Sequence, residues 1–213
     1  MDRFLSVVAF AAAGLLAATS AGAQDRDVLW RIVNHCVGRD GKALPAPDAN
    51  CPHLQEVWQS DPDYVAISDI KLTGWRPEFV HGLVTPRRDR VEDVEDPRRP
   101  DAIWDFAWRA AKTRIAEESE IALAVNPPTR RSQNQLHVHI VRLKEDGRQR
   151  LEQNVNRQTV RDPAEIWSVA AKLANSREFG VIVVGLAGGE FLVAVTDSSD
   201  SPEARYTQGR CAR

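Results

Sequence analysis

The sequence lacks most of the features that would assign it directly to a common class. Its net charge is only −2 over 213 residues, so no overall field favours nucleic acid as a partner. It contains no internal repeat and no low-complexity tract, which argues against repeat and fibrous architectures. The apolar stretch at residues 4–18 is short for a membrane span. The remaining composition, 43% hydrophobic and 27% charged, is ordinary for a soluble globular protein.

Cysteine is also scarce, with three residues in the chain. Cys36 and Cys51 are separated by a loop rich in glycine and proline, and in an oxidising compartment they are expected to form a disulfide. Closing a loop of that length stabilises a fold by roughly 3 kcal/mol. A zinc site built from both cysteines and His53 is the alternative. Cys211 is the odd cysteine. It is free, forms a disulfide with another chain, or replaces Cys36 or Cys51 in the disulfide.

The N-terminus has the form of an export signal. A basic residue precedes the apolar stretch, and the small residues 21–23 match a cleavage site. We therefore expect residues 1–23 to be a signal peptide and residues 24–213 to form a single domain, periplasmic or secreted. Asp2 weakens the positive charge of the signal, so an uncleaved segment anchored in the inner membrane is the alternative. No cysteine follows the cleavage site, which argues against a lipid anchor.

Hydrophobic periodicity predicts an α+β fold with a mainly antiparallel sheet and flanking helices. Helices are predicted at residues 27–35, 101–119 and 163–176, and strands at 64–68, 79–85, 121–125, 136–143, 181–186 and 191–195. Gly188 and Gly189 are typical of a hairpin turn between the last two strands. Residues 149–161 are ambiguous, and the polar tail from Asp197 is expected to be irregular.

The predicted helix at residues 101–119 has one apolar face that includes Trp104 and Trp108. Helical spacing favours core packing for both tryptophans rather than contact with lipid. Asp101 is expected to cap this helix, and Asp162 the helix at residues 163–176.

His137 and His139 are the most informative residues of the chain. On a strand they point to the same face, with Cα atoms about 6.5–7 Å apart. Gln135 shares that face, whereas Leu136 and Val138 lie on the opposite, apolar one. Two adjacent imidazoles suit nucleophilic catalysis, proton transfer or metal binding. A purely structural role is disfavoured, because two histidines are expensive to bury without partners.

A metal site would need a third ligand, for which His81 or an aspartate is the candidate. No spacing such as His-Glu-x-x-His supports it. We therefore expect neither a metal nor another cofactor.

Basic residues cluster at 87–90, 98–99 and 130–131. The ordinary explanation for such clusters is a solvated surface. Arg130 and Arg131 stand out because they lie just before the strand that contains the two histidines.

Three segments together resemble the histidine triad superfamily. Residues 133–140 are similar to its His-φ-His-φ-His strand, residues 79–87 to its earlier "gHxLVxPk" strand, and residues 122–126 to the strand between them. Residues 29–33, with the two cysteines that follow, resemble the opening of the CDP-diacylglycerol pyrophosphatase family. The chain is thus similar to that family within a superfamily with a HIT-like fold.

The resemblance implies hydrolysis of CDP-diacylglycerol to CMP and phosphatidate in two steps. His137 takes the position of the nucleophile, which forms a nucleotidyl-histidine before water releases the nucleotide. His139 takes the position beside the phosphate and the leaving oxygen, as a hydrogen-bond or proton donor. A neutral imidazole is required for the attack, and an ordinary pKa near 6.5 provides one at about pH 7.

A diphosphate concentrates negative charge, so basic and amide side chains near the histidine strand are expected to bind it. The candidate substrate-binding residues are Lys71, His81, Asn126, Arg130, Arg131, Ser132, Gln133 and Asn134. Lys71 and His81 are the weaker candidates. The partners implied are CDP-diacylglycerol or a related nucleotide diphosphate and a membrane surface. A homodimer is compatible with the resemblance, and nucleic acid is not expected.

Gln135 departs from the family, which usually has histidine at this position. Glutamine forms hydrogen bonds but carries no titratable proton. Either it is a tolerated replacement of a supporting residue, or the protein has altered substrate choice or reduced activity. The alternatives to the expected function are a hydrolase of a soluble nucleotide pyrophosphate and a weakly active or non-catalytic protein that binds nucleotides or phospholipid headgroups.

Overall fold

The computed structural model describes residues 25–42, 51, 56–69, 79–92, 94 and 96–209. The predicted signal peptide, Lys71, His53 and Cys211 lie outside these residues. The structure therefore does not test what we expect of them.

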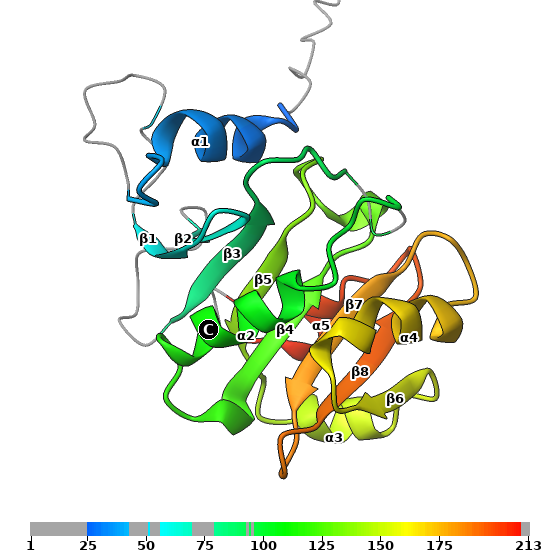
Figure 1. The fold of residues 1–213 in the computed structure, drawn as a ribbon. Helices are drawn as coiled ribbons and strands as arrows, with labels where there is room; N and C mark the ends of the chain where they lie inside the picture. Colours follow the sequence, from blue (N-terminus) through cyan, green and yellow to red (C-terminus); the bar gives the residue numbers. More distant parts are fainter. Residues whose placement is uncertain are drawn as a thin grey trace, which may run out of the picture.

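The described chain is built around an antiparallel sheet of eight strands, in the order β1-β2-β3-β5-β4-β7-β8-β6 (Figure 1). The strands are β1 (Val57–Ser60), β2 (Tyr64–Ser68), β3 (His81–Pro86), β4 (Ile121–Val125), β5 (Val138–Arg142), β6 (Arg157–Val160), β7 (Gly180–Gly185) and β8 (Phe191–Thr196). Every neighbouring pair is antiparallel. The predicted α+β class is thus confirmed.

Among the described residues, five α-helices pack around the sheet. They are α1 (Val28–Cys36), α2 (Ile103–Lys112), α3 (Gly147–Glu152), α4 (Ile166–Leu173) and α5 (Pro202–Tyr206). Helices α2 and α4 cover one face, α3 and α5 lie against the other, and α1 lies near the β1–β2 end (Figure 1). Within the described part of the chain, no helix combines the length and apolarity needed to cross a membrane.

Side chains alternate between the two faces of the sheet along each strand, so the two faces carry different sets of residues. One face packs under α2 and α4 in a continuous core that includes Val138, Ile140, Trp104 and Trp167. The tryptophan rings are 4.7 Å apart between centroids. Core packing of Trp104 and Trp108, as predicted, is confirmed.

The opposite face carries two separate apolar clusters. One lies under α1 and includes Leu29, Val65 and Leu83. The other lies under α3 and α5 and includes Leu151 and Tyr206. The buried polar side chains of this face, which include His81 on β3, His139 on β5 and Asn126 just after β4, lie between the two clusters.

Several boundaries differ from the prediction. Helix α2 ends at Lys112 rather than Ser119, and residues 118–120 form a separate 3₁₀ turn. The predicted cap of Asp101 is wrong, because the helix has no side-chain cap and Ala102 occupies the N-cap position. Asp162 does act as a cap: its carboxylate accepts a hydrogen bond from the Ala164 amide at 2.9 Å, in the turn that leads into α4.

The tail was expected to be irregular, and this prediction is wrong. Ser201 caps helix α5 by accepting from the Ala204 amide, and Pro202 occupies the first turn. Serine followed by proline is a recognised helix start. The segment at residues 149–161, ambiguous in the sequence, contains the end of α3 and strand β6. Strand β1 is an addition that the sequence pattern did not predict.

The structure joins Cys36 and Cys51 in a disulfide with a Cα–Cα distance of 5.5 Å. This pairing excludes the alternative zinc site, because both sulfur atoms are in the covalent bond. Gly188 and Gly189 both have φ near +80°, the left-handed conformation of a two-glycine hairpin turn between β7 and β8. The hairpin prediction is confirmed.

Candidate functional site

The site begins at His137, immediately before β5. Its Nδ1 lies 2.7 Å from the main-chain carbonyl oxygen of Gln135. A carbonyl only accepts hydrogen bonds, so Nδ1 must carry the ring proton. The lone pair of the neutral ring is therefore on Nε2, which is the arrangement required of a nucleophile.

The side chain of Gln135 has a different task from its main chain. Its Nε2 donates to the carbonyl oxygens of Pro86 and Asp89, at 3.4 and 3.2 Å. These contacts tie the start of the histidine strand to the loop that follows β3. The group that orients His137 is thus a carbonyl, which any residue at position 135 supplies.

The surroundings of His137 keep its ring uncharged. Burial lowers its pKa, the hydrogen bond with Gln135 opposes that change, and the positive charge of Arg131 lowers the pKa further. The residue is 6% exposed, and its neighbours include the Gln135 carbonyl and the His139 ring. The charges of Arg131, Glu203 and Asp69 also act on it, so the buried ring lies among polar groups.

His139 lies beside His137, with the two ring centroids 4.8 Å apart. Its Nε2 is 3.3 Å from the amide nitrogen of Asn126 and 3.4 Å from a carboxylate oxygen of Glu203. Burial lowers the pKa of His139. We infer that the His139 ring is neutral and forms hydrogen bonds, rather than being a protonated ring that acts as a general acid.

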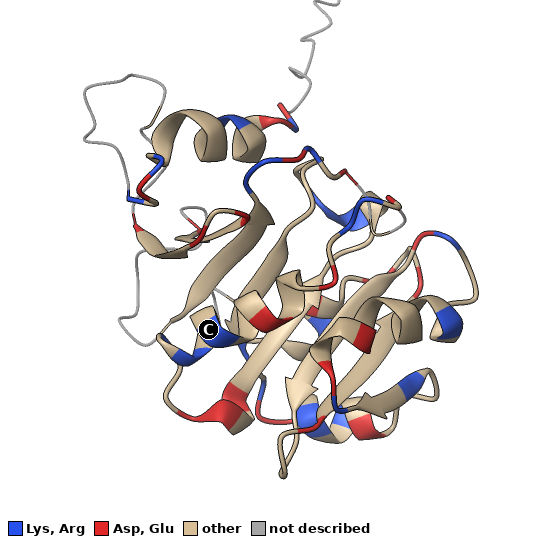
Figure 2. Ribbon diagram, in the orientation of Figure 1, with Lys and Arg blue, Asp and Glu red and all other residues tan. Residues whose placement is uncertain are grey.

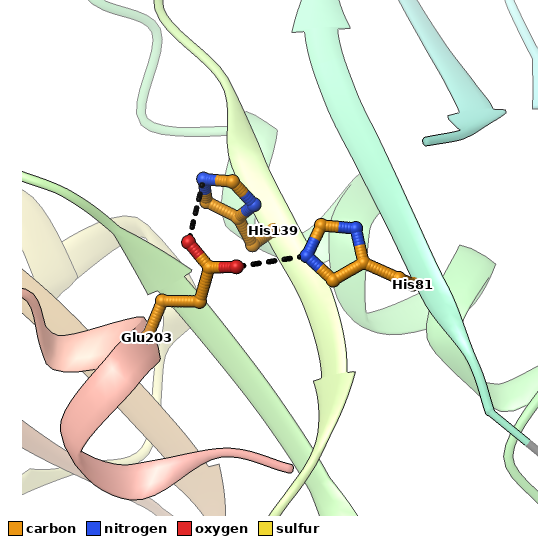
Figure 3. A group of neighbouring side chains, drawn as sticks. All are labelled: His81, His139 and Glu203. Atoms are coloured by element: carbon orange, nitrogen blue, oxygen red, sulfur yellow. Dashed lines mark hydrogen bonds and ion pairs between the residues drawn. The ribbon is translucent and has the colours of Figure 1, made fainter. Parts of the chain in front are cut away.

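Glu203, on α5, is the residue that the sequence analysis missed. Its two carboxylate oxygens contact different partners. Oε1 lies 2.9 Å from His81 Nε2 (Figure 3), and Oε2 accepts from the Asn126 amide at 2.6 Å. Ser201 donates to the other end of that amide, Asn126 Oδ1, at 2.7 Å. Burial raises the pKa of Glu203, but the contacts with His139, His81 and Asn126 outweigh it and lower the pKa overall. Since His139 is neutral, we attribute the stabilisation of the carboxylate mainly to His81 and Asn126.

His81, a weaker candidate in the sequence, lies between two carboxylates. Its Nδ1 is 3.3 Å from Asp69 Oδ2 on one side, and its Nε2 faces Glu203 on the other. Burial alone lowers its pKa, but the two carboxylates raise it above the ordinary value. The two carboxylates thus favour the protonated form of His81, whose ring is 5.3 Å from the His139 ring.

Other predicted substrate-binding side chains are used elsewhere. Gln133 accepts from the Leu29 amide at 2.8 Å, and Asn134 accepts from Arg26 at 2.8 Å, so both hold the N-terminal segment around α1. Arg130 is exposed and donates to the carbonyl of Ser199. Arg131, the second arginine of the predicted pair, acts on His137 through its positive charge, which lowers the pKa of that ring. Ser132 is only partly buried in the same loop.

A hollow of about 660 Å³ lies away from the histidines, near the end of β3. Arg39, Ser60, Arg87 and Arg88 contribute to its lining. Arg87 already donates to Ser60 and to the carbonyls of Asp61 and Gly38. Its lining contains no histidine or cysteine, so we place the chemistry at the histidine cluster instead.

The fold and the cluster together define an α+β protein with a histidine site on one face of an antiparallel sheet. A protein-family model described as CDP-diacylglycerol pyrophosphatase matches residues 24–185. The chain belongs to this family, and it is therefore a hydrolase whose implied substrate is CDP-diacylglycerol. None of the curated proteins matches the chain significantly. Ser201 and Glu203 lie beyond the matched residues.

Proposed function

We propose that this chain hydrolyses CDP-diacylglycerol to CMP and phosphatidate through a nucleotidyl intermediate on His137. The observation that carries the proposal is the 2.7 Å contact between His137 Nδ1 and the Gln135 carbonyl. It leaves Nε2 with a free lone pair, and burial favours the neutral ring that the attack requires.

In the first step, His137 Nε2 attacks the phosphorus that bears the cytidine. A nitrogen–phosphorus bond forms, and the bond from this phosphorus to the bridging oxygen breaks. The electron pair leaves with phosphatidate. The ring becomes positively charged, and its Nδ1 proton remains hydrogen-bonded to the Gln135 carbonyl. Phosphatidate leaves as a weak base, so a hydrogen bond from neutral His139 suffices to assist it.

In the second step, water attacks the same phosphorus. The nitrogen–phosphorus bond breaks, CMP leaves, and one proton of the water is released to solvent. The His137 ring returns to its neutral form. Asn126, held between Ser201 and Glu203, is the group we place beside the phosphate oxygens, because its amide is buried among polar neighbours.

Rapid quenching followed by mass spectrometry tests the intermediate directly. After mixing with CDP-diacylglycerol, the peptide that contains His137 should gain the mass of one cytidylyl unit and lose it within a turnover. His137→Ala should show neither the adduct nor turnover. His35→Ala, a substitution of an exposed histidine on α1, is the matched control and should behave as the wild type. An adduct on any other residue would contradict the assignment.

The same assay separates the alternatives. Binding of CDP-alcohols without turnover by the wild-type protein would support the non-catalytic binding function. Preference for a soluble dinucleotide over CDP-diacylglycerol would support the soluble nucleotide substrate.

We also propose that the chain is exported, has the HIT-like fold and acts at a membrane surface. The disulfide supports an oxidising compartment. The adjacency of β3, β5 and β4, which brings His81 beside His139, supports the superfamily relationship. Sequencing of the mature N-terminus after cell fractionation tests export, and a mature chain that begins near residue 24 is expected. Vesicle co-sedimentation tests membrane association, and light scattering tests a homodimer.

A further inference from the structure

Three side chains of the site bring donor atoms of metal-ligand type together. One nitrogen each of His81 and His139 and one oxygen of Glu203 all lie within 4.8 Å of one another. They come from β3, β5 and α5, and both rings face the carboxylate (Figure 3). The His137 ring, which the proposed reaction uses, is not a member of this group.

The donor set suits a transition metal of the zinc type. Imidazole nitrogen and carboxylate oxygen are its usual ligands, and three protein ligands leave a fourth position open. Bonds of about 2.0–2.1 Å in a tetrahedron place neighbouring donors roughly 3.3 Å apart. Each ring already lies near that distance from one carboxylate oxygen of Glu203: His81 Nε2 is 2.9 Å from Oε1, and His139 Nε2 is 3.4 Å from Oε2.

A second observation concerns the support behind one ligand. Asp69 Oδ2 lies 3.3 Å from His81 Nδ1, on the side of the ring away from Glu203. A carboxylate behind a histidine ligand is a common arrangement in metal sites, where it fixes the ring and increases its basicity. A bound ion takes the place of the proton on His81, so both imidazoles are neutral as ligands. The two carboxylates then carry two negative charges, which a divalent cation balances.

We propose that His81, His139 and Glu203 bind one Zn²⁺-type ion, and that this ion inhibits the hydrolase. Binding occupies His139 Nε2, the atom nearest the Asn126 amide, and locks the histidine that assists the leaving group. The binding part stands independently of the reaction. The inhibitory part rests on the proposed function.

Calorimetric titration of the metal-free full chain with Zn²⁺, and absorption spectra with Co²⁺, test the binding part. One ion should bind per chain, and Co²⁺ should give the visible bands of a tetrahedral site. Glu203→Gln and His81→Asn should each weaken binding at least about 100-fold, because each removes a ligand. Glu145→Gln, at an exposed position, is the matched control, and His137→Asn should bind as the wild type.

Circular dichroism melting keeps this test interpretable, since a ligand variant that melts as the wild type is folded. Absence of binding by the wild type would overturn the proposal. So would equal binding by wild type and Glu203→Gln, because the ion would then be held adventitiously by other residues.

A hydrolysis assay tests the inhibitory part. Zn²⁺ should reduce turnover of CDP-diacylglycerol in the wild type, and a chelator should restore it. Turnover that rises with Zn²⁺ would overturn the inhibitory role. Hydrolysis without Zn²⁺ binding would overturn this inference alone, whereas Zn²⁺ binding without any hydrolysis would overturn the proposed function and leave the metal site intact.

Discussion

The two faces of the histidine strand have different roles: one packs in the apolar core, and the other carries the histidines of the site. Alternate residues of one short segment form the two faces. Val138 and Ile140 are fully buried in the apolar core under α2. His137 and His139 are also buried, but among polar groups, and each depends on a specific partner. The apolar face stabilises the fold through burial area, which tolerates varied residues of similar size. The polar face depends on single atoms, so one substitution there should remove function without unfolding the protein.

Charged residues are also distributed unevenly, between the strands of the sheet and the segments around it. The central strands carry almost no Lys, Arg, Asp or Glu, and most charged residues lie in helices and loops (Figure 2). The carboxylates of the site come from Asp69, just after β2, and from Glu203 on α5. The sheet therefore supplies the imidazoles, and the segments around it supply the negative charge.

The largest effect should come from His137→Ala. Removing the nucleophile should lower turnover of CDP-diacylglycerol by at least about 1,000-fold, because His137 is the ring whose Nε2 lone pair is fixed by the Gln135 carbonyl. The unfolding free energy, measured in urea, should fall by only about 1–2 kcal/mol, since the hydrogen bond lost is the one to the Gln135 carbonyl. Activity within tenfold of the wild type would contradict the assignment.

The converse change on the opposite face is Ile140→Ala. Ile140 has no exposed surface, and truncation of such a residue costs about 2–5 kcal/mol of unfolding free energy. Turnover measured well below the melting temperature should stay within about threefold of the wild type. If turnover fell as far as in His137→Ala while the protein remained folded, the separation between the two faces would not hold.

The sequence predicted the apolar part of this comparison well, because burial follows a simple period. Alternation assigned Leu136, Val138 and the two histidines to the correct faces, and helical spacing placed Trp104 in the core. Helix α2 ended earlier than its pattern suggested: Ile115, beyond its end, still packs in the core, but residues 118–120 form a separate 3₁₀ turn just before β4.

The site was harder to predict, since its partners are far apart in the chain. Glu203 is separated from Asn126 by 77 residues, and no spacing rule connects them. The tail around Ser201 looked polar and irregular, although its serine and proline are a helix start. Gln133 and Asn134 were assigned to substrate because they precede the histidines. A linear motif does not show that their side chains point instead to the N-terminal segment, at Leu29 of α1 and at Arg26 just before it.

An intermediate effect is expected from Asn126→Ala. The amide joins Glu203, at 2.6 Å, to His139, at 3.3 Å, so its loss leaves both less well positioned. Turnover should fall about 10- to 100-fold, with the decrease mainly in kcat if Asn126 positions groups during the reaction. Asn34→Ala on α1, which removes a contact with the Trp30 carbonyl, is the control and should leave kcat unchanged. A change confined to KM would instead indicate a role in binding alone.

The smallest effect is expected at Gln135, the position where the family usually has histidine. The carbonyl that orients His137 belongs to the main chain, and the side chain only ties the strand to Pro86 and Asp89. Gln135→His should therefore keep turnover within about threefold of the wild type, because a histidine ring also provides an N–H group that can donate to the same loop. Gln135→Ala should lower stability by about 1 kcal/mol, through loss of those bonds, more than it lowers the rate. A gain of tenfold or more in Gln135→His would show instead that a titratable side chain at this position contributes to the reaction, and that the glutamine limits the enzyme.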